Sequence, residues 1–235
     1  MRRFFLILRR FSNLGLQAEG RKSRSVSTLS KPRARARGAS NGLTLLILFL
    51  VGALQIKGYS QQGGQGMKSV VMIIASENFR DEELLQPQEV LERNGIKVKV
   101  ASTTLQEVRG MLGAKVKPDI LVQDIDVRDF AAVIFIGGIG ASQYWDDPLA
   151  HALAQSALNN NKIVAAICIA PVTLAKAGIL KGKQATVWSS ESAQLKAGGA
   201  NYTGRAVQKD GNIITAAGPF AAREFAEEIS RALQK

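Results

Sequence analysis

The stretch Lys162–Gly178, KIVAAICIAPVTLAKAG, decides the fold of this chain. Its run from Ile163 to Ile167 is short, apolar and rich in β-branched residues, a pattern typical of a strand buried on both faces of a parallel sheet. Pro171 suits the first turn of a helix and Gly178 the position after its end, so the two predict a helix between them. The stretch therefore predicts a strand, a sharp turn and a helix.

Cys168, the only cysteine of the chain, falls at this turn. Ala166 and Ala170 lie two residues to either side and allow neighbouring backbone to pass closely, so the arrangement predicts a nucleophile elbow. A thiol at a helix N-terminus also feels the helix dipole, which favours the thiolate. The alternative is a buried structural cysteine. A single cysteine excludes an internal disulfide and a thiolate metal cluster.

The formal charge of +12 is concentrated at one end of the chain. Residues 1–66 carry 12 of the 31 Lys and Arg residues and one acid, Glu19, so this segment has a charge of +11. Residues 67–235 carry 19 basic and 18 acidic residues and are nearly neutral. A domain that binds nucleic acid gathers basic residues on one face, so this distribution argues against such a partner. The 169 residues from Met67 onward suit one domain with a sizeable core.

The first 66 residues form a basic segment that we expect to lie outside the fold. An Arg/Ser-rich region (1–38) precedes an uncharged apolar run (43–54) and a Gln/Gly linker (57–66). This order is typical of an export signal. The apolar run is shorter than the roughly 20 residues of a full membrane span, although it could still anchor the chain. The alternatives are an organelle transit peptide and a translation start at Met67, which would make the protein cytoplasmic.

From Met67 onward the chain alternates expected strands and helices. This alternation predicts a mostly parallel sheet with helices on both faces. Asp210-Gly211 predicts a hairpin near the C-terminus, and the Gly- and Pro-containing residues 108–122 predict an excursion that ends in a short strand. The expected strands are 70–75, 96–101, 133–136, 163–167 and 185–188, and the expected helices are 82–94, 148–159, 171–178, 191–197 and 219–233.

Three loops follow the carboxyl ends of expected buried strands, where α/β sheets form their sites. The loop 76–83 is acidic, the loop 137–143 begins with two glycines, and the third loop holds Cys168. A carboxyl group beside a thiol tunes its reactivity, and Gly-rich backbone leaves N–H groups free to bind an anion. Alternatively, the acids mark a solvated helix start and the glycines a tight turn.

Four stretches of the chain resemble the ThiJ/PfpI family of the class I glutamine amidotransferase-like superfamily, and they span essentially all of residues 67–235. They are FRDEELLQP (79–87), FIGGIGA (135–141), AAICIAPVTLA (165–175) and NIITAAGPFAAREFA (212–226). The resemblance implies a flavodoxin-like three-layer sandwich with a nucleophile elbow, usually assembled as a homodimer.

The resemblance also implies roles for individual residues. The reactive cysteine of the family falls on Cys168, and its partner glutamate, four residues before a proline, falls on Glu83, with Glu82 as the alternative. The backbone donors of the family match Gly137, Gly138 and Ile169.

The chain departs from the family pattern where a histidine would stand. Members described as proteases or amidases carry His directly after the cysteine, where this chain has Ile169. Members that resemble glyoxalases and deglycases place a His after the next strand, where this chain has Trp188. The only histidine, His151, lies in the expected helix 148–159, and we expect it to be solvated and far from the elbow. A Cys–His dyad is therefore unsupported.

Arg80, Glu82 and Trp188 are candidates for contacts with a substrate. Arg80 could receive an anionic group or remain a surface residue. Trp188, together with Tyr144 and Trp145, could form the wall of a pocket or fill the core.

The resemblance implies glyoxalase- or deglycase-like action on small reactive carbonyls or their adducts, with Cys168 as the nucleophile and Glu83 as the proton-transfer group. An alternative is a non-enzymatic sensor or protective protein in oxidative stress, in which an oxidant converts Cys168 to a sulfinic acid. A cysteine peptidase or amidase is a third interpretation. We expect no cofactor, no metal and no nucleic acid, and contact with a membrane only through residues 43–54.

Overall fold

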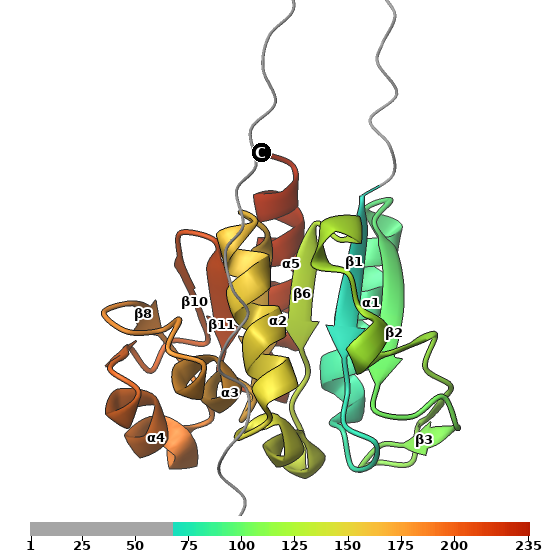
Figure 1. The fold of residues 1–235 in the computed structure, drawn as a ribbon, viewed down its shortest axis with the longest axis horizontal. Coiled ribbons are helices and arrows are strands. Elements are labelled where there is room, and N and C mark those ends of the chain that lie inside the picture. Colours follow the sequence, from blue (N-terminus) through green and yellow to red (C-terminus); the bar gives the residue numbers. More distant parts are fainter. Residues whose placement is uncertain (1–67) are drawn as a thin grey trace, which may run out of the picture. The chain divides into compact units, whose positions relative to one another are not determined.

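A seven-stranded sheet forms the centre of residues 68–235, the part of the chain that the computed structural model describes (Figure 1). Every neighbouring pair of its strands is parallel except β10 with β11, so the predicted mostly parallel sheet is confirmed. The strand order is β10-β11-β7-β6-β1-β2-β5. The strands are β1 (Ser69–Ile73), β2 (Lys97–Ser102), β5 (Ile120–Leu121), β6 (Ala132–Phe135), β7 (Ile163–Ile167), β10 (Val207–Asp210) and β11 (Ile213–Ala216).

Helices cover both faces of this sheet and complete three layers. In Figure 1, α2 (Pro148–Asn159) crosses in front of the sheet, while α1 (Asp81–Arg93) and α5 (Ala222–Leu233) lie behind it. α3 (Pro171–Lys176) follows β7 and packs on the side of α2, and α4 (Ser192–Ala197) packs against α3. The three-layer sandwich expected from the resemblance is confirmed.

Each face of the sheet has its own core because successive side chains of a strand point to opposite faces. On β1, Val71 and Ile73 join the core beneath α2, whereas Val70 and Met72 join the core beneath α1 and α5. β6 and β7 divide their residues in the same way, and all nine of their residues are buried. This explains why their sequences are continuously apolar rather than alternating.

Short elements lie outside the main sheet. β3 (Val108–Arg109) and β4 (Lys115–Val116) form the expected hairpin excursion, and β8 (Gln184–Ala185) pairs with β9 (Asn201–Tyr202) in a separate small sheet. The expected strand 185–188 is therefore wrong beyond Ala185. The N–H of Thr186 donates to a threonine side chain of β11, and the N–H of Trp188 donates to the carbonyl of Cys168, so neither joins a strand ladder.

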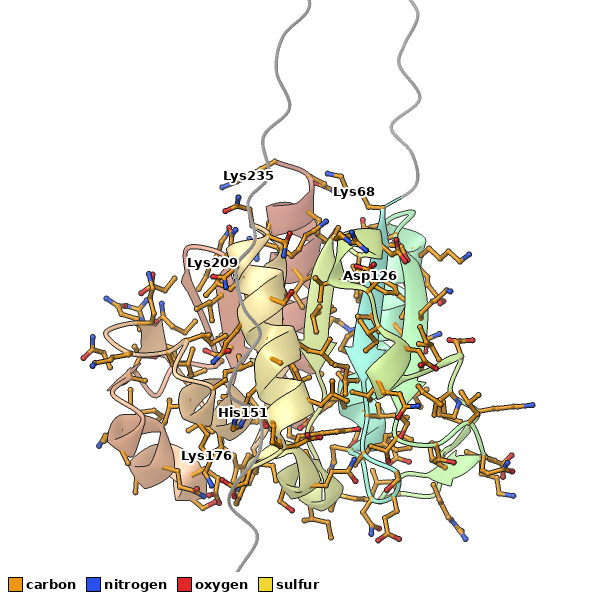
Figure 2. All side chains as sticks on the ribbon, viewed as in Figure 1. Lys68, Asp126, His151, Lys176, Lys209 and Lys235 are labelled. Carbon is orange, nitrogen blue, oxygen red and sulfur yellow. The ribbon has the colours of Figure 1, made fainter. Side chains whose placement is uncertain are left out.

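The two ends of the described chain lie at the amino edge of the sheet, away from the loops that carry the candidate residues. Figure 2 shows Lys68 and Lys235 together at this edge, and the ammonium group of Lys68 donates to the carbonyl of Leu233. No helix within residues 68–235 is long and apolar enough to cross a membrane. The basic segment, the apolar run 43–54 and the Gln/Gly linker lie outside the described residues, so their assignment as a signal or anchor stays a prediction.

Candidate active site at the cysteine elbow

Cys168 occupies a strained position between β7 and α3. Its φ angle is +63°, in the left-handed region that residues with a side chain rarely adopt. Two hydrogen bonds hold it there: its N–H donates to the carbonyl of Ala216 at 2.9 Å, and its carbonyl accepts the N–H of Trp188 at 2.8 Å. Strain of this kind persists only where the surrounding structure enforces it, and it is concentrated at functional sites. The predicted nucleophile elbow is present in the structure.

Glu83 is the carboxyl group that faces this thiol. It lies in the first turn of α1 and is fully buried, and its Oε2 accepts the N–H of Gly137 at 3.1 Å. Its other oxygen, Oε1, is buried without a hydrogen-bond donor among residues 68–235, a costly arrangement for an ionised carboxylate. Glu83 is therefore the carboxyl group that lies beside Cys168, whereas Glu82 is bonded to Arg80.

Gly137 permits the close approach of the thiol and the carboxyl group. A Cβ atom at this position would lie 2.5 Å from Cys168 Cβ and 2.5 Å from Glu83 Oε2, so any side chain here would displace one of the two. The sequence predicts that the N–H of Gly137 is free to bind an anion. This prediction is wrong, because the N–H donates to Glu83.

Burial raises the pKa of both members of the pair. The pKa of Glu83 rises to about 8 because burial disfavours its charged form, an effect that hydrogen bonds from Cys168 and Gly137 partly offset. The pKa of Cys168 rises to about 12, first through burial and then through the negative charge of Glu83. Burial therefore outweighs any benefit from the short helix α3, and the expected stabilisation of the thiolate by the helix dipole is not the dominant effect. At neutral pH the pair holds both protons.

Two backbone amides lower the pKa of Cys168. The N–H groups of Gly138 and Ile169 are directed at the sulfur of Cys168, and each lowers the pKa that burial and Glu83 raise. Gly138 has a φ angle of +96°, and a Cβ atom there would lie 2.4 Å from the backbone nitrogen of Arg80. Glycine is thus required at this position for the loop to present its amide to the thiol.

A pocket of about 250 Å³ opens above Cys168. The cysteine itself is only 9% exposed, so the pocket is its route to small molecules. Most of the lining is apolar, with Arg80 as its one charged side chain. The lining residues are Arg80, Met111, Gly138, Ile139, Cys168, Ile169, Trp188 and Pro219.

The predicted substrate contacts take different places around this pocket. Arg80 lines it, and its guanidinium group is held by the carboxylate of Glu82 at 2.8 Å. Glu82 does not line the pocket and instead orients Arg80. Trp188 lines the pocket with its ring and is 40% exposed. Glu83 lies behind Cys168 and not in the lining, so its access to a substrate is through the sulfur.

His151 lies on α2 (Figure 2) and takes no part in the lining of the pocket. The expectation of a solvated histidine is wrong in detail, because His151 is half-buried and its Nε2 contacts the carbonyl of Trp145 at 2.8 Å. Trp145 in turn donates its ring N–H to the carbonyl of Ile169 at 3.2 Å. Trp145 therefore supports the residue after Cys168 and does not form a pocket wall.

Tyr144 belongs to the core and not to the pocket. It is buried, and its hydroxyl group donates to the carbonyl of Ile74 at 2.8 Å. Of the three aromatic candidates, only Trp188 faces the pocket.

Sequence reasoning missed three walls of the pocket: Met111, Ile139 and Pro219. Met111 reaches the pocket because the buried carboxylate of Asp81 accepts the N–H groups of Leu112 at 2.8 Å and Ala114 at 2.7 Å. These bonds fix the β3–β4 hairpin against the start of α1. The acidic character of loop 76–83 was the available signal, but it did not indicate which acid holds which loop.

No His, Cys, Asp and Glu side chains within residues 68–235 gather in a group that could hold a metal ion. The described site is thus made of a thiol, a carboxyl group, backbone amides and an apolar pocket.

The fold and the site define a class: α/β sandwiches with a cysteine on a strained elbow beside a buried carboxyl group. The family model for the DJ-1/PfpI family matches residues 68–232, and the chain belongs to this family. The protein MJ0967 of Methanocaldococcus jannaschii is 44% identical over 81% of this chain and 95% of its own length. The crystal structure of a ThiJ/PfpI domain protein from Brachyspira murdochii is 36% identical, covers 71% of this chain and 96% of its own, and superimposes with a TM-score of 0.70.

Two further relatives have names that state an activity. The glutathione-independent glyoxalase DJR-1.2 of Caenorhabditis elegans is 28% identical over 71% of this chain and 89% of its own length. The deglycase TK1284 of Thermococcus kodakarensis is 30% identical over 63% of this chain and 90% of its own length.

Proposed function

We propose that this protein converts small reactive carbonyl compounds, of the α-oxoaldehyde type, to 2-hydroxy acids through Cys168 and Glu83. One observation carries the proposal. The strained thiol of Cys168 faces a pocket on one side and the buried carboxyl group of Glu83 on the other, and the pKa of that carboxyl group is raised to about 8. A carboxyl group with a pKa near the working pH is suited to both donating and accepting a proton.

The chemistry begins when the sulfur attacks the aldehyde carbon. The reaction starts from the minor form in which Glu83 is ionised. Glu83 accepts the thiol proton, a carbon–sulfur bond forms, and the aldehyde oxygen takes up a proton from water to give a hemithioacetal. A proton then moves from the former aldehyde carbon to the neighbouring carbonyl carbon, and the hydroxyl proton moves to the oxygen of that carbonyl group, which yields the thioester of a 2-hydroxy acid. Water hydrolyses the thioester, releases the acid and restores the thiol. The net change is the addition of one water molecule to the substrate.

The residues around the sulfur have separate tasks in this scheme. Glu83 takes the proton of the thiol before attack and returns a proton to the sulfur when the thioester is hydrolysed, so it is needed again after the sulfur has reacted. Because Glu83 does not line the pocket, the protons that move within the substrate travel through water in the pocket. The amides of Gly138 and Ile169, which already point at the sulfur, stabilise the negative charge that develops as the thiol loses its proton. Arg80, with Glu82 behind it, supplies positive charge at the pocket for the oxygen atoms of the substrate.

The relatives named as a glyoxalase and a deglycase support this reaction class. This chain differs in having Trp188 where similar family members are expected to carry a histidine. The proposal therefore assigns proton transfer to Glu83 and requires no imidazole.

The experiment follows methylglyoxal loss and lactate formation by the full chain and by its Cys168→Ser, Glu83→Gln and Glu82→Gln variants. We expect Cys168→Ser to abolish turnover and Glu83→Gln to reduce kcat at least a hundredfold, in the range of general acid–base catalysis. Glu82→Gln removes the neighbouring carboxylate that orients Arg80, so it should raise KM and largely retain kcat. Full activity in Cys168→Ser would refute the proposal.

A redox role is the second candidate, supported by the same amides around the sulfur. In this role a peroxide oxidises Cys168 to a sulfinic acid, whose oxygens would accept the N–H groups of Gly138 and Ile169. Mass spectrometry after mild peroxide treatment separates the two. Clean addition of two oxygens to Cys168, without carbonyl turnover, would favour the redox role. The homodimer implied by the resemblance stays a prediction, which analytical ultracentrifugation would test.

A further inference from the structure

The exposed apolar side chains of this protein concentrate at the mouth of the Cys168 pocket. Eight large apolar side chains within residues 68–235 are exposed. Three of them line the pocket, and Leu112 and Phe220 are the direct chain neighbours of the lining residues Met111 and Pro219. The three that line the pocket are Met111 (37% exposed), Ile139 (64%) and Trp188 (40%). Exposed apolar side chains that cluster in this way mark a binding site, whereas scattered ones carry no meaning.

The walls of the pocket come from separate elements, and identified contacts hold two of them, at Met111 and at Trp188. Met111 is fixed by the bonds of its hairpin to Asp81 and by its own N–H, which donates to the carbonyl of Phe79 at 2.9 Å. The ring of Trp188 lies against Gly218, where a Cβ atom would come within 2.7 Å of it. Because Gly218 has no side chain, the ring of Trp188 can pack against it, next to Pro219. The apolar surface is a formed wall and not a set of free side chains.

The volume of the pocket exceeds what methylglyoxal requires. About 250 Å³ corresponds to roughly eight water molecules at about 30 Å³ each. Methylglyoxal presents only one methyl group beside its two carbonyl groups, and it would leave most of the apolar wall in contact with water. A larger apolar substituent would displace this water and bury the walls, which is favourable in proportion to the apolar area removed from water.

We propose that the pocket selects α-oxoaldehydes that carry a large apolar substituent, such as a phenyl or branched alkyl group, over methylglyoxal. This inference rests on the proposed function. In the productive position the aldehyde carbon lies at Cys168, the oxygen atoms lie toward Arg80 and the elbow amides, and the substituent lies between Met111 and Trp188. These two side chains determine specificity, whereas Cys168 and Glu83 perform the chemistry.

The first test measures kcat/KM for methylglyoxal and phenylglyoxal in the full chain and in three variants. We expect a preference for phenylglyoxal of at least tenfold in the unaltered protein, in the range that added apolar groups supply in such pockets. Met111→Ala and Trp188→Ala should each reduce this preference at least threefold. Leu105→Ala is the matched control, because Leu105 is similarly exposed (43%) but lies outside the pocket lining, and it should leave the preference unchanged.

The second test measures binding without turnover, so that failure of the inference can be told from failure of the proposed function. Mandelate and lactate are the 2-hydroxy acids that correspond to the two aldehydes, and they differ only in carrying a phenyl or a methyl group. Each is used to protect Cys168 from alkylation by iodoacetamide, followed by mass spectrometry. We expect mandelate to give half-protection at a concentration at least tenfold lower than lactate, and Met111→Ala to remove most of this difference.

The outcomes separate clearly. Turnover of both aldehydes without a phenyl preference would overturn the inference and leave the proposed function intact. Absence of turnover together with preferential protection by mandelate would refute the proposed function but support the apolar selectivity of the pocket. Equal protection by both acids would overturn the inference whatever the turnover, and would indicate that the apolar mouth serves another occupant, such as a second copy of the chain.

Discussion

Substitution of Glu83 by Gln should make this protein more stable at neutral pH, although it removes a residue that we assign to the chemistry. The carboxyl group of Glu83 is fully buried, and its pKa is raised from 4.5 to about 8 because burial disfavours the charged form. A glutamine has nearly the same shape and retains an oxygen that accepts the N–H of Gly137. It cannot ionise, so it does not incur the cost of a buried charge.

The size of the effect follows from the two pKa values of Glu83 in the unfolded and folded states. Below about pH 4.5 the folded and unfolded states both hold the proton of Glu83, so the free energies of unfolding of the wild type and Glu83→Gln differ by an amount that does not change with pH. Between pH 4.5 and 8 the unfolded state releases the proton and the folded state keeps it, so the free energy of unfolding of the wild type falls by about 1.4 kcal/mol per pH unit. Relative to Glu83→Gln, the wild type therefore loses about 3 kcal/mol by pH 7 and about 5 kcal/mol above pH 8.

The assay is urea unfolding of the full chain and of Glu83→Gln at pH 5, 6, 7 and 8, with the difference in free energy of unfolding plotted against pH. Cys168 does not disturb this range, because its pKa is raised from 9 to about 12. Glu82→Gln is the control: Glu82 is half-buried and bonded to Arg80, and this bond lowers its pKa, so it titrates below the range. Parallel curves for the wild type and Glu83→Gln would show that Glu83 is ionised in the folded protein and would refute the reasoning.

Three further substitutions test the supports of the elbow. Gly137→Ala should lower the free energy of unfolding by about 1–3 kcal/mol and abolish turnover, since its methyl group would lie 2.5 Å from Cys168 Cβ; thermal unfolding and methylglyoxal assays check this, and an unchanged melting temperature would contradict it. Trp145→Phe should change the alkylation rate of Cys168 at least twofold, since it removes the ring N–H that donates to Ile169, together with part of a ring that packs against the core. An unchanged rate would exclude a positioning role. Asp81→Asn should raise KM more than it lowers kcat, and it should speed hydrogen exchange of the two hairpin amides that donate to Asp81. Exchange of these amides as slow as in the wild type would contradict this prediction.

Most of the fold could be predicted because its sequence signals are local and agree with one another. The helix at Pro148–Asn159 begins with Pro after Asp147, whose side chain accepts the N–H of Leu149, and the expected range equals the observed one. The strand Ile163–Ile167 was also found in full, because continuous β-branched residues indicate burial on both faces. The expected strand 185–188 failed because the partners of Thr186 and Trp188 are Thr215 and Cys168, which are distant in sequence.

The candidate site shows the same difference between features that local sequence signals indicate and features that depend on contacts between distant residues. The strand–turn–helix pattern indicates Cys168 and the paired glycines indicate Gly138, because both are sequence signals with a physical basis. The choice of Glu83 among the acids of loop 76–83 came from the resemblance to the ThiJ/PfpI family. The occupation of the Gly137 N–H by Glu83 could not be predicted, because it depends on how closely two loops approach. The same holds for Met111, whose place in the pocket is decided by two bonds from a hairpin to Asp81.

The raised pKa values of Cys168 and Glu83 lead to a prediction that separates two roles of the carboxyl group. Burial opposes ionisation of both groups, and the negative charge of Glu83 also opposes ionisation of Cys168, so the pair holds at most one negative charge near neutral pH. If Glu83 only stabilised the thiol, its replacement by Gln would release the thiolate and speed every reaction of the sulfur. If Glu83 also moves protons, Glu83→Gln should speed alkylation of Cys168 by iodoacetamide at pH 8, about tenfold for each pH unit by which the thiol pKa falls, and yet slow methylglyoxal turnover. Alkylation and turnover changing in the same direction would contradict the proton-transfer role, because only a group that is needed after the sulfur has reacted can have opposite effects on the two rates.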